Sequence, residues 1–125
     1  LESDAIIEEM ILVDNMGERV SSALSVTEDA RIPEEFAVHQ NYPNPFNPST
    51  LIKLDANKVM HTSILVYDIM GREIRSLVNK ELQAGYHQFI WDGMDQKGNK
   101  VGSGVYFIVT QTPEVVKTMK ATLLR

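Results

Sequence analysis

The segment WDGMDQKGNKVGSG, residues 91–104, contains the side chains best placed to do chemistry in this sequence. Asp92, Asp95 and Asn99 offer oxygen atoms within one loop, and such oxygens are the ligands that Ca²⁺ prefers. An EF-hand loop, however, needs acidic groups at alternating positions and a bidentate Glu at its twelfth position, and the spacing here differs. The loop therefore supports a calcium site only weakly, and we expect no metal and no cofactor.

The same loop is rich in residues that build turns. Asp and Asn side chains accept hydrogen bonds from the backbone of their own turn, and glycine adopts positive φ angles without strain. We expect turn hydrogen bonds from Asp92 and Asn99, and positive φ angles at three glycines: Gly93, Gly98 and Gly102. The predicted structural turn is built on two aspartates and two glycines: Asp92, Gly93, Asp95 and Gly98.

The histidines and paired carboxylates do not form a catalytic set. His39, His61 and His87 fall in different segments, and no serine or cysteine nucleophile motif is near any of them. Two pairs of adjacent glutamates, at positions 8–9 and 34–35, make poor acid–base partners because neighbours on a strand point to opposite faces. The chain is therefore not expected to be an enzyme.

The segment NYPNPFNPST, residues 41–50, combines three prolines with two aromatic residues. Proline has no N–H group for a central strand and disfavours helix in the residue before it. We expect a stiff, extended segment that presses Tyr42 and Phe46 onto the domain. Its role is either structural or recognition by a partner, and the candidate recognition residues are Tyr42, Pro43, Asn44, Pro45 and Phe46.

The last predicted strand, VVKTMKATLL at residues 115–124, has mixed polar and apolar residues on both faces. Alternation places Lys117 on one face and Lys120 on the other. Either these lysines protect an edge strand against pairing with another chain, or a partner recognises the strand through them.

The composition indicates one domain with an appendage. The 125 residues are 43% hydrophobic, and their net charge of −5 argues against nucleic acid as a partner. The absence of cysteine excludes disulfides and thiolate metal sites. No apolar run approaches the roughly 20 residues of a membrane span. Since the sequence begins with Leu1, we expect a fragment or processed product with any signal peptide upstream.

From residue 49 onward, short alternating segments and turn signals predict an all-β fold, an antiparallel β-sandwich of about seven strands. The expected strands are residues 35–40, 49–56, 62–69, 73–79, 86–91, 104–110 and 115–124, with a hairpin across DIMGRE. Alternation within them predicts a buried core: Ile52, Leu54, Leu65, Tyr67, Phe89, Trp91, Tyr106 and Ile108.

Residues 1–31 differ from the rest and end in a linker, SVTEDARIP at residues 25–33. The stretch at residues 9–26 resembles residues 63–78, with an apolar run, Asp, Met-Gly and a second apolar run, and this favours another hairpin. A helix over residues 4–13 is the alternative, although no capping box completes its start.

Four stretches together resemble the C-terminal sorting domain of the type IX, or Por, secretion system. They are FAVHQNYPNPFNPST, VYDIMGREIRSL, GYHQFIWDGMDQKGNKVGSGVYFI and VVKTMKATLL. The chain is also similar to the Ig-like domain of flagellar hook-capping proteins, through the Trp-Asp-Gly and Gly-Val-Tyr pieces. The resemblance implies an Ig-like sandwich over residues 32–125 and a cargo tail with linker over residues 1–31.

The resemblance further implies a secretion and sorting signal. An outer-membrane export machine would grip the terminal strand in the periplasm of a Gram-negative bacterium, and a surface protease or sortase would then cleave the domain or exchange it for a lipopolysaccharide anchor. The product would be secreted or held on the cell surface, behind an attached cargo domain.

Two other functions are compatible with the sequence. Residues 1–31 could donate a strand to a second copy and so build a homo-oligomeric fibre or surface layer. A carbohydrate-binding accessory domain would need an exposed aromatic platform, and the four tyrosines spread over different strands argue mildly against it: Tyr42, Tyr67, Tyr86 and Tyr106.

Overall fold

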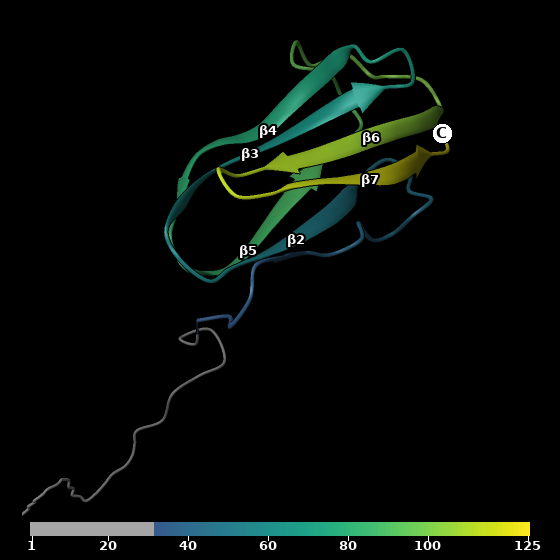
Figure 1. The fold of residues 1–125 in the computed structure, drawn as a ribbon. Coiled ribbons are helices and arrows are strands. Elements are labelled where there is room, and N and C mark those ends of the chain that lie inside the picture. Colours follow the sequence, from purple (N-terminus) through teal and green to yellow (C-terminus); the bar gives the residue numbers. More distant parts are fainter. Residues whose placement is uncertain (1–31) are drawn as a thin grey trace, which may run out of the picture. The chain divides into compact units, whose positions relative to one another are not determined.

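The computed structural model describes residues 32–125, and the remaining residues are drawn as a grey trace in Figure 1. The described residues contain seven strands: β1 (Ala37–Val38), β2 (Thr50–Ala56), β3 (Met60–Asp68), β4 (Glu73–Leu82), β5 (Gly85–Trp91), β6 (Gly104–Gln111) and β7 (Val116–Leu123). The hairpin predicted at residues 9–26 and its helical alternative lie outside this part of the chain.

The strands form two antiparallel sheets. One sheet has the order β1-β2-β5 and the other the order β4-β3-β6-β7. Figure 1 shows them as two layers that enclose the core. The predicted fold class, an Ig-like antiparallel β-sandwich of seven strands, is confirmed.

The predicted β3–β4 hairpin has a local cause. Asp68 Oδ1 accepts hydrogen bonds from the backbone N–H groups of Met70 (2.9 Å) and Arg72 (3.0 Å), and Gly71 takes a positive φ of 83°. The N–H donor of Arg72 lowers the pKa of the Asp68 carboxyl below its ordinary value. A single aspartate thus closes the turn, as short polar side chains do.

Trp91 lies at the centre of the core. It is fully buried, and its ring centroid lies 5.3 Å from that of Phe46 and 5.2 Å from that of Tyr106. Tyr106 also donates a hydrogen bond from Oη to the Gly102 carbonyl oxygen at 2.7 Å, which resembles the tyrosine corner of Ig-like domains. Burial raises the pKa of the Tyr106 hydroxyl.

Five of the eight predicted core residues are buried: Ile52, Leu54, Trp91, Tyr106 and Ile108. Phe89 is partly buried and packs against the core. The prediction was wrong for the other two, Leu65 and Tyr67, which are only partly buried.

In β3 the opposite face is inside the sandwich, where Ile64 and Val66 are fully buried. The segment TSILVYDI has apolar residues on both faces, so alternation could not choose between them. Pairing with β6 decides the matter: Val66 lies opposite Ile108, and directly opposed residues share a face. The core side of β3 is therefore set by its neighbour, not by its own pattern.

Candidate functional site

The proline block, residues 41–48, is held by a buried polar network. Asn41 is only 1% exposed, and its Nδ2 donates hydrogen bonds to Thr50 Oγ1 (2.9 Å) and to the Pro43 carbonyl oxygen (3.4 Å). Thr50 Oγ1 in turn donates to the same carbonyl oxygen at 2.8 Å. These bonds satisfy buried polar groups and fold the block back onto the start of β2.

The block passes from one sheet to the other. At its start, Tyr42 exchanges two backbone hydrogen bonds with Leu51 of β2, at 3.0 and 2.8 Å. Further on, the Phe46 N–H donates to the Thr122 carbonyl oxygen (2.9 Å), and the Leu124 N–H donates to the Phe46 carbonyl oxygen (3.0 Å). In Figure 1 this segment precedes β2 and runs towards the end of β7. The block therefore joins the two sheets along one side of the sandwich.

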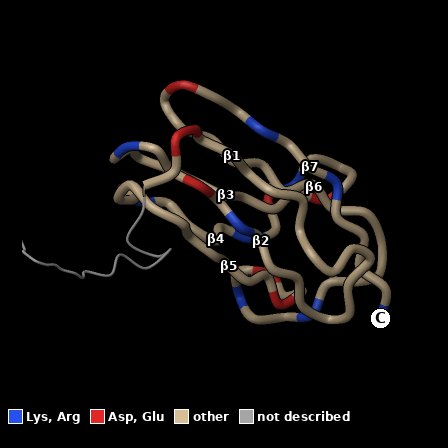
Figure 2. Tube along the Cα trace, turned by 90° about the horizontal axis from the view of Figure 1, so that it is seen from below, with Lys and Arg blue, Asp and Glu red and all other residues tan. Residues whose placement is uncertain are grey.

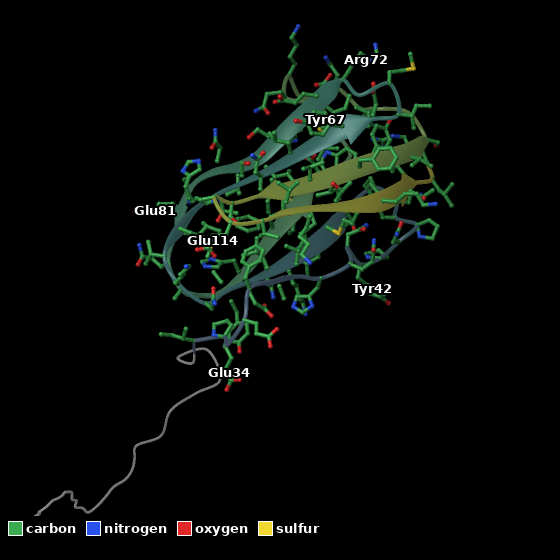
Figure 3. All side chains as sticks on the ribbon, in the orientation of Figure 1. Glu34, Tyr42, Tyr67, Arg72, Glu81 and Glu114 are labelled. Atoms are coloured by element: carbon green, nitrogen blue, oxygen red, sulfur yellow. The ribbon has the colours of Figure 1, made fainter. Side chains whose placement is uncertain are left out.

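The two aromatic rings of the block have different positions. Phe46 is 1% exposed and packs on Trp91, as expected. The expectation that Tyr42 would also be pressed onto the domain was wrong, because this side chain is 79% exposed. Asn41 turns inward to its hydrogen bonds, so its neighbour Tyr42 points outward, where Figure 3 shows it on the surface.

The fold brings the two candidate recognition segments together. The Lys120 carbonyl oxygen accepts hydrogen bonds from Asn44 Nδ2 (3.2 Å) and Gln40 Nε2 (3.1 Å). Asn44 Oδ1 accepts a hydrogen bond from the Thr122 N–H at 2.9 Å. The Asn44 side chain thus replaces a strand backbone at the outer edge of β7. The two segments are separated by more than 60 positions, roughly half the chain, and no local residue pattern shows that they meet.

Lys117 and Lys120 do not form one charged patch. Lys117 lies opposite the buried Thr110, on the inner side of the sheet, whereas Lys120 lies opposite Phe107 on the outer side. Both lysines are exposed. Figure 2 likewise shows basic and acidic residues scattered over the described part of the chain. An inward-pointing lysine at a sheet edge is a known means of opposing edge-to-edge association.

Part of the β7 edge stays open. The proline block covers the outer edge from Lys120 to Leu124. Among residues 32–125 no strand pairs with Val116 to Met119 on the side of β7 that faces away from β6. Unpaired N–H and C=O groups at such an edge can bind an added strand. The open portion lies directly next to the proline block.

The Trp-Asp-Gly loop, residues 91–101, is a network of backbone turns. Asp92 Oδ1 accepts a hydrogen bond from the Met94 N–H (3.1 Å), and Asp95 Oδ1 accepts from the N–H groups of Lys97 and Asn99 (2.9 Å each). The Asn99 N–H is the main cause of a lowered pKa at the Asp95 carboxyl. The side chains that accept the turn hydrogen bonds are therefore those of Asp92 and Asp95. Asn99 takes part in the turn through its backbone N–H and C=O groups.

Positive φ angles in this region occur at Gly93 (74°), Gly98 (89°) and Gly104 (153°). The expectation of a positive φ at Gly102 was wrong, because its conformation lies outside that range. Glycine is required most strongly at Gly93. A Cβ atom there would lie 2.9 Å from the Pro48 carbonyl oxygen and 3.0 Å from Arg125 Nη2.

The Trp-Asp-Gly loop also covers the edge of β4. The Gln96 N–H donates to the Ile74 carbonyl oxygen (3.0 Å), and Gln96 Oε1 accepts from the Ser76 N–H (2.9 Å). Arg75 Nη1 adds an ion pair with Asp92 Oδ1 at 2.9 Å. The loop therefore occupies backbone groups of β4 that another strand could otherwise bind.

Arg125 joins the terminal segment to this loop and was missed by sequence analysis. Its Nη2 donates to the Gly93 carbonyl oxygen and its Nε to the Val101 carbonyl oxygen, at 2.6 Å each. Its backbone N–H donates to Ser103 Oγ at 2.9 Å. The proline block, the Trp-Asp-Gly loop and the terminal segment thus meet at one end of the sandwich.

The three histidines have separate neighbours. His39 Nε2 lies 2.8 Å from Asp55 Oδ2, His61 Nε2 lies 2.7 Å from Asn79 Oδ1, and His87 Nε2 lies 2.7 Å from a backbone carbonyl oxygen. Among residues 32–125 no three His, Asp or Glu side chains are grouped so as to hold a metal ion. The same residues include no helix suited to crossing a bilayer.

These features define a class of protein module: an Ig-like sandwich with one side closed by a proline block and one end by a Trp-Asp-Gly loop. The model of the FlgD Ig-like domain matches residues 46–114, more than half of the 125 residues. The chain belongs to the FlgD Ig-like domain family. The match ends before β7 and begins at Phe46, so most of the proline block and the terminal strand lie outside it.

Two solved structures from Porphyromonas gingivalis are similar to this chain. Dimeric latent PorU has a TM-score of 0.56 and 18% identity, covering 74% of this chain and 10% of that one. PorZ, an essential surface component of the type-IX secretion system, has a TM-score of 0.48 and 23% identity, covering 72% and 11%. The chain spans about a tenth of the length of these proteins. At 18% identity the likeness to PorU concerns the fold. No curated protein matches the chain.

Proposed function

We propose that residues 32–125 are a C-terminal sorting domain that directs an attached cargo domain through the type IX outer-membrane export machinery. In this proposal the domain has no catalysis of its own. The machinery recognises it in the periplasm of a Gram-negative bacterium, and it is then cleaved or exchanged for an anchor at the cell surface.

The observation that carries the proposal is the backbone pairing of Phe46 with the end of β7. The proline block and the terminal strand are both part of the resemblance to sorting domains, and both extend beyond the FlgD match. Their pairing makes a single surface from Tyr42 to Lys120. A receptor could therefore read both segments at once, together with the open β7 edge beside them.

The same proposal assigns no catalytic activity to the domain. Each histidine that the structure describes has its own neighbour on a different part of the sandwich, and none lies beside a nucleophile motif. A folded tag requires only a stable fold that presents its recognition surface. The buried core around Trp91 stabilises that fold.

The test is an export assay in a bacterium that has a type IX system, with a reporter cargo fused in front of the full chain. Cargo should reach the surface or the medium, and removal of residues 32–125 should leave it in the periplasm. Cargo that is exported equally well without these residues would contradict the proposal.

Point variants then locate the surface that is read. Lys120→Gln and Lys117→Gln are made singly, because the two side chains lie on opposite faces of the sheet. Lys53→Gln on β2 is the matched control. Each exposed charge contributes about 1 kcal/mol or less to stability, so all variants should fold. Reduced export for Lys120→Gln, with a normal Lys53→Gln, would place recognition at the β7 edge beside Asn44.

One observation favours a second function, a structural subunit that assembles by strand donation from residues 1–31. The open edge from Val116 to Met119 could accept such a strand. Gel filtration separates the two functions. The sorting domain should elute as a monomer at micromolar concentration. Strand donation would instead give a series of larger oligomers, and removal of residues 1–31 would reduce their size.

A further inference from the structure

The outer face of the three-stranded sheet has a groove that shares Tyr42 with the proposed recognition surface but otherwise lies outside it. Its volume is about 540 Å³, and its floor is the outer side of β2, from Leu51 through Lys53 to Asp55. Its walls include His39, Tyr42 and Tyr86. The four tyrosines are dispersed in the sequence, but the sheet brings two of them to one groove.

The two tyrosines stand at opposite ends of this floor. Tyr42 is bridged to Leu51, and Tyr86 lies opposite Asp55 in the β2–β5 register. Leu51 and Asp55 are four positions apart along the strand, about 13 Å at the usual rise per residue. Tyr42 is 79% and Tyr86 52% exposed, so both rings are available to a ligand. Figure 3 shows Tyr42 on the surface, away from the four-stranded sheet.

The groove between the two tyrosines is lined by one acidic and one basic side chain, Asp55 and Lys53. Asp55 contributes one negative charge and Lys53 one positive charge, and His39 Nε2 lies 2.8 Å from Asp55 Oδ2. The Asp55 side chain is 20% exposed, so the carboxylate is reachable but fixed in position by its neighbour. Such a floor offers both donors and acceptors and has no excess of either charge.

We propose that this groove binds an uncharged saccharide chain. The C–H faces of pyranose rings stack on tyrosine rings, which are apolar on the face and polar at the hydroxyl. Sugar hydroxyls would hydrogen-bond to Asp55, Lys53 and His39 between the two stacking positions. A ligand with apolar ring faces and many neutral hydroxyls matches a groove with aromatic ends and a charge-balanced polar floor.

A peptide strand fits this place less well. Peptides commonly bind sheets by adding a strand to a free edge, where backbone groups are unpaired. The floor of the groove is β2, which lies between β1 and β5 and already uses its backbone on both sides. A ligand here must be recognised by side chains alone, which a saccharide permits.

The test is an NMR titration of the full chain with three neutral oligosaccharides: maltohexaose, cellohexaose and hexa-N-acetylchitohexaose. We expect at least one to cause saturable shifts at Lys53, Asp55 and Tyr86 in the millimolar range. Replacing Tyr86 by Leu keeps an apolar side chain but removes the ring. It should weaken binding by about two- to tenfold, the range that one stacking contact contributes. Tyr86→Phe should keep most of the affinity.

Ile69→Ala is the control variant, because Ile69 is 70% exposed in the β3–β4 turn, away from the groove, and should leave binding unchanged. Melting curves establish that each variant is folded, and Tyr42→Leu provides a second test at the other end of the groove. No saturable binding by any of the three saccharides would overturn the inference, as would shifts confined to other surfaces. The inference stands apart from the proposed function, since Tyr86→Leu should not affect export.

Discussion

Arg125 and Gly93 are joined by a hydrogen bond of 2.6 Å from the guanidinium Nη2 to the glycine carbonyl oxygen. The two residues are 32 positions apart in sequence. The Pro48 carbonyl oxygen also approaches Gly93, and it lies 2.9 Å from the position that a Cβ atom would occupy. Three distant segments therefore converge on a residue that has no side chain, and this convergence can be tested.

Replacing Gly93 by Ala should destabilise the domain more than replacing Gly98 by Ala. Both glycines have a positive φ, which costs a non-glycine residue roughly 1–2 kcal/mol. At Gly98 nothing lies within 4 Å of the added Cβ, whereas at Gly93 the methyl group also meets Pro48 and Arg125. The free energy of unfolding in urea measures both variants, and equal losses would show that the close approach at Gly93 is relieved without cost.

Replacing Trp91 by Ala should lower the free energy of unfolding by about 3–5 kcal/mol, as deletion of a large buried aromatic side chain does. Trp91 is fully buried and contacts the rings of Phe46 and Tyr106. Its neighbour Ile90 is 65% exposed, so Ile90→Ala is the control and should have little effect. A Trp91→Ala variant that melts like the parent would rule out the core described above.

The two faces of β3 can be compared directly. Ile64 is fully buried, whereas its neighbour Leu65 is partly exposed on the outer face. Ile64→Ala should cost about 2–5 kcal/mol, and Leu65→Ala distinctly less, because the outer site leaves no closed cavity. Thermal and urea unfolding of the pair measure this difference. The reverse order of stability would require β3 to be shifted by one residue.

Asp95 should give the domain a pH-dependent part of its stability. Backbone N–H donors, first that of Asn99, lower the pKa of its carboxyl below the ordinary value of 3.8. A carboxyl with a lowered pKa in the folded state stabilises the protein fully above its ordinary pKa, and this contribution is lost as the pH falls through the lowered value. Asp95→Asn should therefore be less stable than the parent at neutral pH, and this difference should shrink in acid.

The measurement for Asp95 is urea unfolding at a series of pH values from neutral to about 2, where the carboxyl becomes protonated. Glu35→Gln, at an exposed position before β1, is the control and should follow the parent at every pH. A difference between Asp95→Asn and the parent that stays constant with pH would mean that the carboxylate charge does not hold the turn.

Limited proteolysis should cut the chain between Val26 and Phe36. This stretch is polar, and proteases cut exposed polar segments rather than strands of a sandwich. Mass spectrometry of the fragments identifies the bonds, and the large product should resist further digestion. Early cuts inside residues 49–110 would contradict the boundary of the domain.

The sequence by itself determined the order and extent of the strands. Strands β2 to β7 lie within a few residues of the predicted ranges, because each depends on local alternation and on turn residues such as Gly71 at its ends. The burial of Trp91 was likewise predictable, since a large aromatic residue on an alternating strand usually faces the core.

Only the tertiary structure decided which segments meet. The core face of β3 depends on pairing with β6, because β3 is apolar on both faces. The contact of Asn44 with β7 and of Arg125 with Gly93, and the shared groove of Tyr42 and Tyr86, join residues that are tens of positions apart. Such contacts arise from the pairing of whole strands, which local residue patterns do not specify. For this reason the candidate surfaces became visible only once the two sheets were in place.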